Sequence, residues 1–93
     1  MNSELKKTLR SINENTGLDL DVYTASGDPV STPTGEGISP DFEGILQQNG
    51  RTYFKAMFRS EQYLFALEGA TRVQKNYAFL LADLIENSSS RAV

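Results

Sequence analysis

The chain has 93 residues, of which 39% are hydrophobic and 23% are charged, and this length and composition predict one globular domain. Its net charge of -3 disfavours nucleic acid as a direct partner, because phosphate binding requires clustered Lys and Arg side chains. The sequence contains no cysteine and no histidine. Disulfide bonds and thiolate chemistry are therefore excluded, a catalytic triad of the usual kind cannot be assembled, and we expect no enzyme activity.

Membrane-spanning and targeting segments are not found in the sequence. No apolar run approaches the length of about 20 residues that a membrane-spanning helix needs. The N-terminus also lacks the apolar core of a signal peptide. We therefore expect a cytoplasmic protein that does not bind a membrane.

The first helix is predicted from Ser3 to Thr16. Three apolar residues and Thr16 recur there at helical spacing, namely Leu5, Leu9 and Ile12. Gly17 follows where a left-handed C-terminal cap is expected. Because the stripe is narrow, we expect this helix to lie over another element rather than inside a core.

A half-buried strand is predicted from Leu18 to Tyr23, where apolar and polar residues alternate. The core-facing residues are Leu18, Leu20 and Val22, and the residues facing away are Asp19, Asp21 and Tyr23. Two carboxylates that point the same way could hold a divalent cation, but further oxygen ligands are not found nearby, so we predict no metal site and no cofactor. A turn at 25–28 precedes a short return strand, Pro29 to Ser31, at an edge.

The segment from Thr32 to Gln48 begins with a glycine-rich loop that ends at Ile38. The rest of the segment permits two interpretations. Ser39 and Pro40 are typical of a helix start, and Phe42, Ile45 and Leu46 would share one helical face, which favours a short helix over 40–48. In the alternative, Asn49-Gly50 is a two-residue hairpin turn that joins a strand over 44–48 to the strand that follows. We favour the helix.

Two aromatic-rich strands and a long helix form the rest of the domain. The strands are predicted over 52–59 and 62–68, joined by a turn at Ser60-Glu61. After Gly69, Thr71 and Gln74 match a capping box at a helix start. The core-facing stripe of this helix is predicted to be Val73, Tyr77, Leu80, Leu81, Leu84 and Ile85. We expect a single α+β domain over residues 1–87, with an antiparallel sheet packed by N- and C-terminal helices, and a disordered tail over 88–93.

A ligand site is predicted on the sheet face opposite the helices. The first long strand carries bulky residues on both sides, so both faces need cover, and the second cover could be the 32–48 segment, a ligand or another subunit. Alternation places Tyr53, Lys55, Met57 and Arg59 together on that second face. Two cations beside an aromatic ring could bind a small anionic metabolite. In the alternative, the ends of Lys55 and Arg59 reach solvent from an edge of the sheet.

The last helix also carries a predicted interface. Phe79 lies away from the expected core stripe, on the side that carries Asp83. Arg72 and Lys75 lie near the helix N-terminus and Asp83 and Glu86 near its end, which opposes the helix dipole. Aromatic residues are common in subunit interfaces, so we predict a homodimer that uses Phe79 and Asp83.

Four segments of the chain together resemble a family of bacterial proteins. Tyr63 to Gly69 and the helix ending at Leu84-Ile85-Glu86, together with Thr16 to Tyr23 and Ser26 to Val30, resemble the N-terminal sensory domain of sugar-diacid and purine-catabolism transcription regulators (the CdaR/PucR type). The resemblance implies a PAS-like or profilin-like fold. It also implies a non-catalytic domain of a transcription regulator that dimerises and senses a small molecule such as a dicarboxylate. The alternative is a protein–protein interaction module without a ligand.

Overall fold

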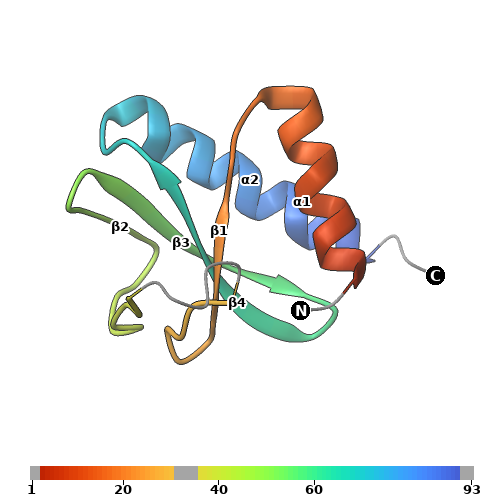
Figure 1. Ribbon diagram of the computed structural model, residues 1–93, viewed down its shortest axis with the longest axis horizontal. Helices are drawn as coiled ribbons and strands as arrows, with labels where there is room; N and C mark the ends of the chain where they lie inside the picture. The colour runs from red at the N-terminus through yellow and green to blue at the C-terminus, as the bar shows by residue number, and fades with distance from the viewer. Residues whose placement is uncertain (1–2, 31–35, 91–93) are drawn as a thin grey trace.

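An antiparallel sheet with two helices on one face forms the fold in the computed structural model, which describes residues 3–30 and 36–90. The elements are α1 (Ser3–Thr16), β1 (Asp21–Thr24), β2 (Ile45–Gln48), β3 (Arg51–Phe58), β4 (Glu61–Glu68) and α2 (Arg72–Ser90). The four strands lie in the order β1-β4-β3-β2. Figure 1 shows α2 running diagonally behind the sheet, with α1 beside it. The predicted α+β class, with N- and C-terminal helices packed on an antiparallel sheet, is confirmed.

The main core lies between the sheet and the two helices. Val22, Phe54 and Phe65 stand in one row across β1, β3 and β4 through the strand register. The rings of Phe54 and Phe65 stack with 5.4 Å between their centroids. The buried members of this core are Leu5, Ile12, Val22, Phe54, Ala56, Phe58, Tyr63, Phe65, Leu67, Ala78, Leu81 and Ile85. Most of the apolar burial that stabilises the fold therefore lies on this face of the sheet.

Local signals at the helix ends agree with the structure. α1 ends at Thr16, and the N–H of Gly17 donates to the carbonyl of Asn13 at 2.7 Å. At the start of α2 the N–H of Thr71 donates to Oε1 of Gln74 at 2.9 Å, and the N–H of Val73 donates to the Thr71 hydroxyl oxygen at 3.2 Å. The predicted capping box is thus confirmed.

The favoured helix over 40–48 is wrong, and the alternative hairpin is correct. Residues 45–48 form β2, which pairs with β3 through a turn in which Asn49 and Gly50 have φ values of 53° and 71°. A turn of this handedness matches the twist of an antiparallel pair. Ile45 packs against the helix-side core whereas Leu46 packs on the opposite face. The apolar residues of this segment therefore serve two faces of a sheet, which a one-sided helix could not do.

The turn between β3 and β4 lies one residue earlier than predicted. β3 ends at Phe58, and Arg59 and Ser60 form the turn with φ values of 53° and 66°. Arg59 is consequently not a strand residue and does not follow the alternation of β3. It forms an ion pair with Glu4 of α1, which lies on the helix side of the sheet.

The buried face of α2 is rotated relative to the prediction. Ala78, Leu81 and Ile85 are buried, whereas four residues assigned to the core stripe are exposed: Val73, Tyr77, Leu80 and Leu84. The small side chain of Ala78, which is fully buried, lies where α2 packs on the sheet, so the close approach of helix and sheet fixes which side faces the core. The predicted disordered tail is also too long, because α2 continues to Ser90. Residues 91–93 lie outside the described part.

The edge beside β1 is completed by a short return of the chain. Pro29 forms an isolated antiparallel bridge with Tyr23, and the N–H of Val30 donates to the carbonyl of Val22 at 2.8 Å. The predicted return strand is therefore present as a bridge, while its last residue, Ser31, and most of the glycine-rich loop (32–35) fall outside the described residues. Within residues 3–30 and 36–90, neither helix has the length and apolarity needed to cross a bilayer.

Ser60→Gly is predicted to stabilise the protein. Ser60 occupies a left-handed conformation in the β3–β4 turn, which costs a non-glycine residue on the order of 1 kcal/mol. We expect the free energy of unfolding in urea to rise by about 0.5–1 kcal/mol. Ser26→Gly, at an exposed turn residue without positive φ, is the control and is expected to give no gain. An equal gain in both variants would contradict the turn geometry.

Ionisation of Tyr63 is predicted to lower the free energy of unfolding at high pH. Its hydroxyl donates to Glu61, and this hydrogen bond, burial and the negative charge of Glu61 raise the pKa of Tyr63 to about 12. The neutral form is favoured in the folded state, so this stabilisation is complete below the unfolded pKa of about 10 and is lost as pH rises towards 12. Urea unfolding between pH 8 and 12 should show a steeper loss for the native protein than for Tyr63→Phe. Parallel pH profiles would contradict this role.

Candidate functional site

The sheet face opposite the helices holds a second, smaller core. Its buried residues are Tyr23, Tyr53, Leu64 and Ala66, and Ile38, Phe42 and Leu46 pack against them. The rings of Tyr23 and Tyr53 approach to 6.2 Å between centroids at an angle of 57°. Residues of the 36–44 segment and β2 therefore cover part of this face, which is one of the covers predicted for it.

Arg51, the first residue of β3, is the charged centre of this face. It forms an ion pair with Asp21, donates from Nη1 to the hydroxyl oxygen of Tyr23 at 3.1 Å, and lies 5.6 Å from the centroid of the Tyr53 ring. Its Nε lies 3.3 Å from Oε1 of Glu68, without the alignment of a hydrogen bond. Only 21% of its side chain is exposed. The guanidinium is thus held in a fixed position by β1, β3 and β4.

The electrostatic surroundings keep Arg51 cationic. Burial by itself would lower the pKa of Arg51, but the hydrogen bond to Tyr23 and the ion pair with Asp21 raise the pKa above its usual value. A half-buried cation requires such partners, because the loss of one of them would leave an uncompensated charge. Its charge is consequently already compensated before any ligand binds.

The strand order explains how Arg51 reaches its partners. β4 lies between β3 and β1, so the side chain must cross about 10 Å, two strand spacings, to reach Asp21. The register pairs Asp21 with Ala66 and Ala66 with Tyr53 across this face. Because position 66 carries only a methyl group, the surface of β4 between β1 and β3 stays low enough for the arginine side chain to pass.

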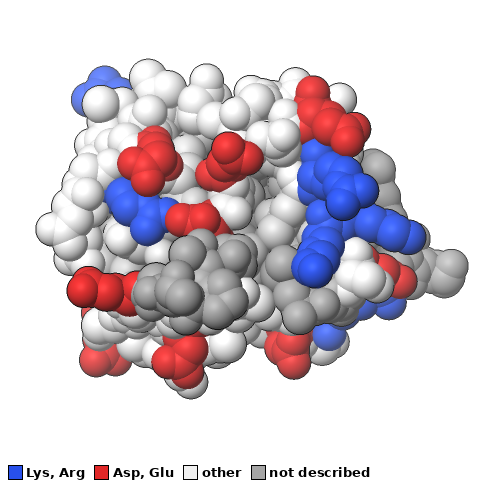
Figure 2. Space-filling view, viewed as in Figure 1, with Lys and Arg blue, Asp and Glu red and all other residues white. Residues whose placement is uncertain are grey.

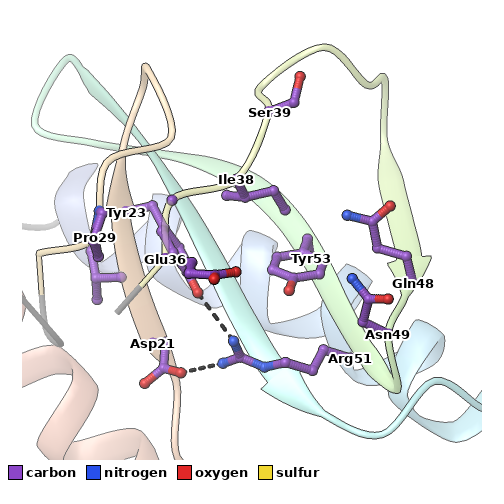
Figure 3. Close-up of a pocket in the computed structure, with 12 residues that line it drawn as sticks. Asp21, Tyr23, Pro29, Glu36, Ile38, Ser39, Gln48, Asn49, Arg51 and Tyr53 are labelled. Atoms are coloured by element: carbon purple, nitrogen blue, oxygen red, sulfur yellow. Dashed lines mark hydrogen bonds and ion pairs between the residues drawn. The ribbon is translucent and has the colours of Figure 1, made fainter. Parts of the chain in front are cut away.

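A cavity of about 480 Å³ opens beside Arg51. Figure 3 shows Arg51 reaching from β3 to Asp21 and Tyr23 of β1 at this cavity. The described lining residues are Asp21, Val22, Tyr23, Pro29, Glu36, Gly37, Ile38, Ser39, Gln48, Asn49, Arg51 and Tyr53. The cavity has the size of a small-molecule site, and its lining combines two tyrosine rings with six other polar or charged side chains.

Gly27 and Lys55 hold the 36–42 segment at this cavity. The N–H of Ile38 donates to the carbonyl of Gly27 at 2.8 Å, which joins the segment to the turn after β1. Lys55 Nζ donates to the carbonyl oxygens of Pro40 and Phe42 at 2.8 and 2.7 Å, and it lies 4.7 Å from the Phe42 ring centroid. Lys55 therefore uses its charge to position this segment, which we name the cover segment (residues 36–42).

The four predicted ligand-binding residues are not brought together. Tyr53 lines the cavity, but Lys55 is engaged by the cover segment. Met57 is 42% exposed and does not line the cavity, and Arg59 lies in the β3–β4 turn paired with Glu4. The predicted position of Arg59 on this face is wrong, because β3 ends at Phe58 and the alternation does not continue to residue 59. Of the predicted set, only Tyr53 stays a candidate for ligand contact.

Sequence reasoning missed Arg51 as the centre of the site. The alternation pattern already contained this information. Arg51 and Tyr53 are two residues apart on β3 and so lie on the same face, and Asp21 and Tyr23 share one face of β1 in the same way. Combining the two strands required the strand order, which the sequence pattern does not supply.

The charges on this side of the molecule are unevenly placed. Figure 2 shows acidic side chains around a basic one on the left of the view, and basic side chains gathered on the right over α1.

Asp19 and Asp21, considered as a cation-binding pair, bind separate partners, because Asp19 accepts from Asn13 of α1 at 2.8 Å and Asp21 pairs with Arg51. The described residues contain no group of three or more potential metal ligands.

Comparisons with protein-family models, with curated proteins and with solved structures gave no match. The resemblance to the sensory domains of bacterial transcription regulators, and the PAS-like or profilin-like fold that it implies, therefore stay predictions based on the sequence.

Gly27→Ala is predicted to release the cover segment. Gly27 has a φ of 92°, and a Cβ at this position would lie 1.7 Å from the carbonyl oxygen of Ile38. Alanine must therefore push away the strand return or the 36–42 segment. We expect a lower melting temperature and faster amide exchange at Ile38 and Phe42, measured by NMR. Gly44→Ala, which meets no atom within 4 Å although φ is also positive, controls for backbone strain alone. Equal exchange at Ile38 in both variants would contradict the anchoring role.

Proposed function

We propose that this chain is a non-catalytic sensory domain that binds a small polar molecule in the cavity beside Arg51. The observation that carries the proposal is the combination of a 480 Å³ cavity with a fixed guanidinium and two tyrosine rings, closed on one side by the 36–42 cover segment. On the basis of the sequence resemblance, we propose further that it belongs to a bacterial transcription regulator and works in the cytoplasm.

The charges that line the cavity favour a ligand with amino or hydroxyl groups. The expectation of an anionic metabolite depended on Lys55 and Arg59, and both are engaged elsewhere. Arg51 is paired with Asp21, so a carboxylate ligand would have to compete with Asp21 for the guanidinium. Glu36, by contrast, is exposed at the cavity wall and can accept a hydrogen bond or pair with an ammonium group. Tyrosine rings add favourable contacts with such a cation.

A ligand screen tests this function. We expect small amines, amino alcohols or polyols to raise the melting temperature of the native protein in a concentration-dependent way, because a ligand that binds only the folded state stabilises it. Glu36→Gln should weaken the binding of an amine at least about tenfold, the loss of one charge-assisted contact. Glu43→Gln, an exposed acid outside the cavity, is the matched control and should bind normally.

The outcome of this screen separates three cases. Dicarboxylates that bind most tightly, unaffected by Glu36→Gln, would show that an anion displaces Asp21 and that the charge argument is wrong. A screen without any thermal shift would instead favour the alternative function, an interaction module without a ligand. The exposed apolar residues of α2 are the specific observation that favours this second candidate.

A further inference from the structure

α2 carries a second apolar face that its own domain does not cover. Val73, Tyr77, Leu80 and Leu84 recur at intervals of four, three and four residues, which places them in one straight line along the helix. Their exposed fractions are 52%, 39%, 67% and 46%. We name these four residues the α2 stripe. It is separate from the buried face formed by Ala78, Leu81 and Ile85.

The α2 stripe is large enough to contribute half of one side of a stable interface. Its exposed fractions correspond to roughly 400 Å² of mainly apolar surface. A contiguous apolar patch of this size on a monomer is often functional. A standard interface buries about 800 Å² on each partner. The adjoining surface supplies more, because a hollow of about 370 Å³ lies beside the stripe and is lined by Thr16, Leu18, Tyr77, Leu80, Leu81 and Leu84.

The charges beside the stripe indicate the partner and its direction. Arg72 precedes the stripe and Asp83 lies near its end, both on the same flank of the helix. Neither forms an ion pair within the described residues. If a second α2 runs antiparallel with Tyr77 opposite the partner subunit's Leu80, Val73 lies opposite the partner subunit's Leu84. The same alignment places Arg72 within one turn of the partner subunit's Asp83. A parallel twofold pair would instead place the two charged flanks on opposite sides of the interface, so Arg72 could not reach the partner subunit's Asp83.

We infer that two copies of this chain associate through antiparallel pairing of their α2 stripes. The stripe is self-complementary about its own midpoint in both apolar contacts and charges, which is what a twofold symmetric interface requires. The pairing of Arg72 with Asp83 sets the direction of the helices, and the apolar stripe supplies the buried area. Phe79 is 60% exposed but lies on a different side of α2, so this interface differs from the one predicted around Phe79. Asp83 is shared by both.

Sedimentation equilibrium of matched variants tests this interface. The native protein should be dimeric, and Leu80→Glu should raise the dissociation constant at least about 30-fold, as loss of a central contact does. Both Leu80 and Phe79 are mostly exposed, so neither change removes core contacts, and circular dichroism verifies the fold. Phe79→Glu is the control and should leave the dimer intact. A native protein that stays monomeric at several hundred micromolar, or a dimer broken by Phe79→Glu but not by Leu80→Glu, would overturn the inference.

A charge exchange and a cross-linking experiment test the direction. Asp83→Arg should weaken the dimer, and the added change Arg72→Asp should restore it. Because the native chain has no cysteine, Val73→Cys and Leu84→Cys proteins can be mixed and oxidised. Antiparallel pairing predicts a disulfide between the two different variants and none in either variant alone. Cross-linking of Val73→Cys with itself, or failure of the charge exchange to restore the dimer, would overturn the antiparallel arrangement.

Discussion

Burial on both faces of the two central strands is the constraint on which the rest of the structure depends. β3 and β4 carry large apolar residues alternately on both sides, so a single layer of helices cannot remove all of them from water. The helices cover Phe54 and Phe65, and the opposite face requires its own cover for Tyr53 and Leu64. This second cover is made by irregular chain and a short edge strand, which leaves room for a cavity where a helix layer would fill the space.

The ionic groups on the second face are arranged to hold that irregular chain in place. Irregular backbone has carbonyl groups that need donors when they approach a core. Lys55 supplies them for Pro40 and Phe42, and Gly27 allows the chain to approach closely enough to bond with Ile38. The positive charge of Lys55 thus has a structural role. Arg51 plays the corresponding part at the other end of the face, where it joins three strands through one guanidinium.

α2 carries two apolar faces, one buried against the sheet and one exposed. Its buried face is narrow and contains Ala78, which allows close packing on the sheet. The second apolar face has no counterpart within the described residues. When a helix has two apolar faces at different angles, its apolar residues together cover a wider arc of the helix surface than a single core-facing stripe would. This width explains why periodicity alone identified the helix correctly and its core face incorrectly.

Interactions between residues close in sequence were determined by the sequence itself. The bounds of α1, the capping box at Thr71 and the existence of two long strands depend on hydrogen bonds and alternation within a few residues, so the pattern predicts them. Only the tertiary structure decided whether residues 45–48 form a helix or a strand, since pairing with β3 outweighs a weak local preference. The tertiary structure also determined which residues form the site. Arg51 contacts Asp21 and Tyr23 because β4 places β1 two strands away from β3 and because the small side chain of Ala66 does not block the arginine. These contacts join residues about 30 positions apart, and no local pattern specifies such a distance.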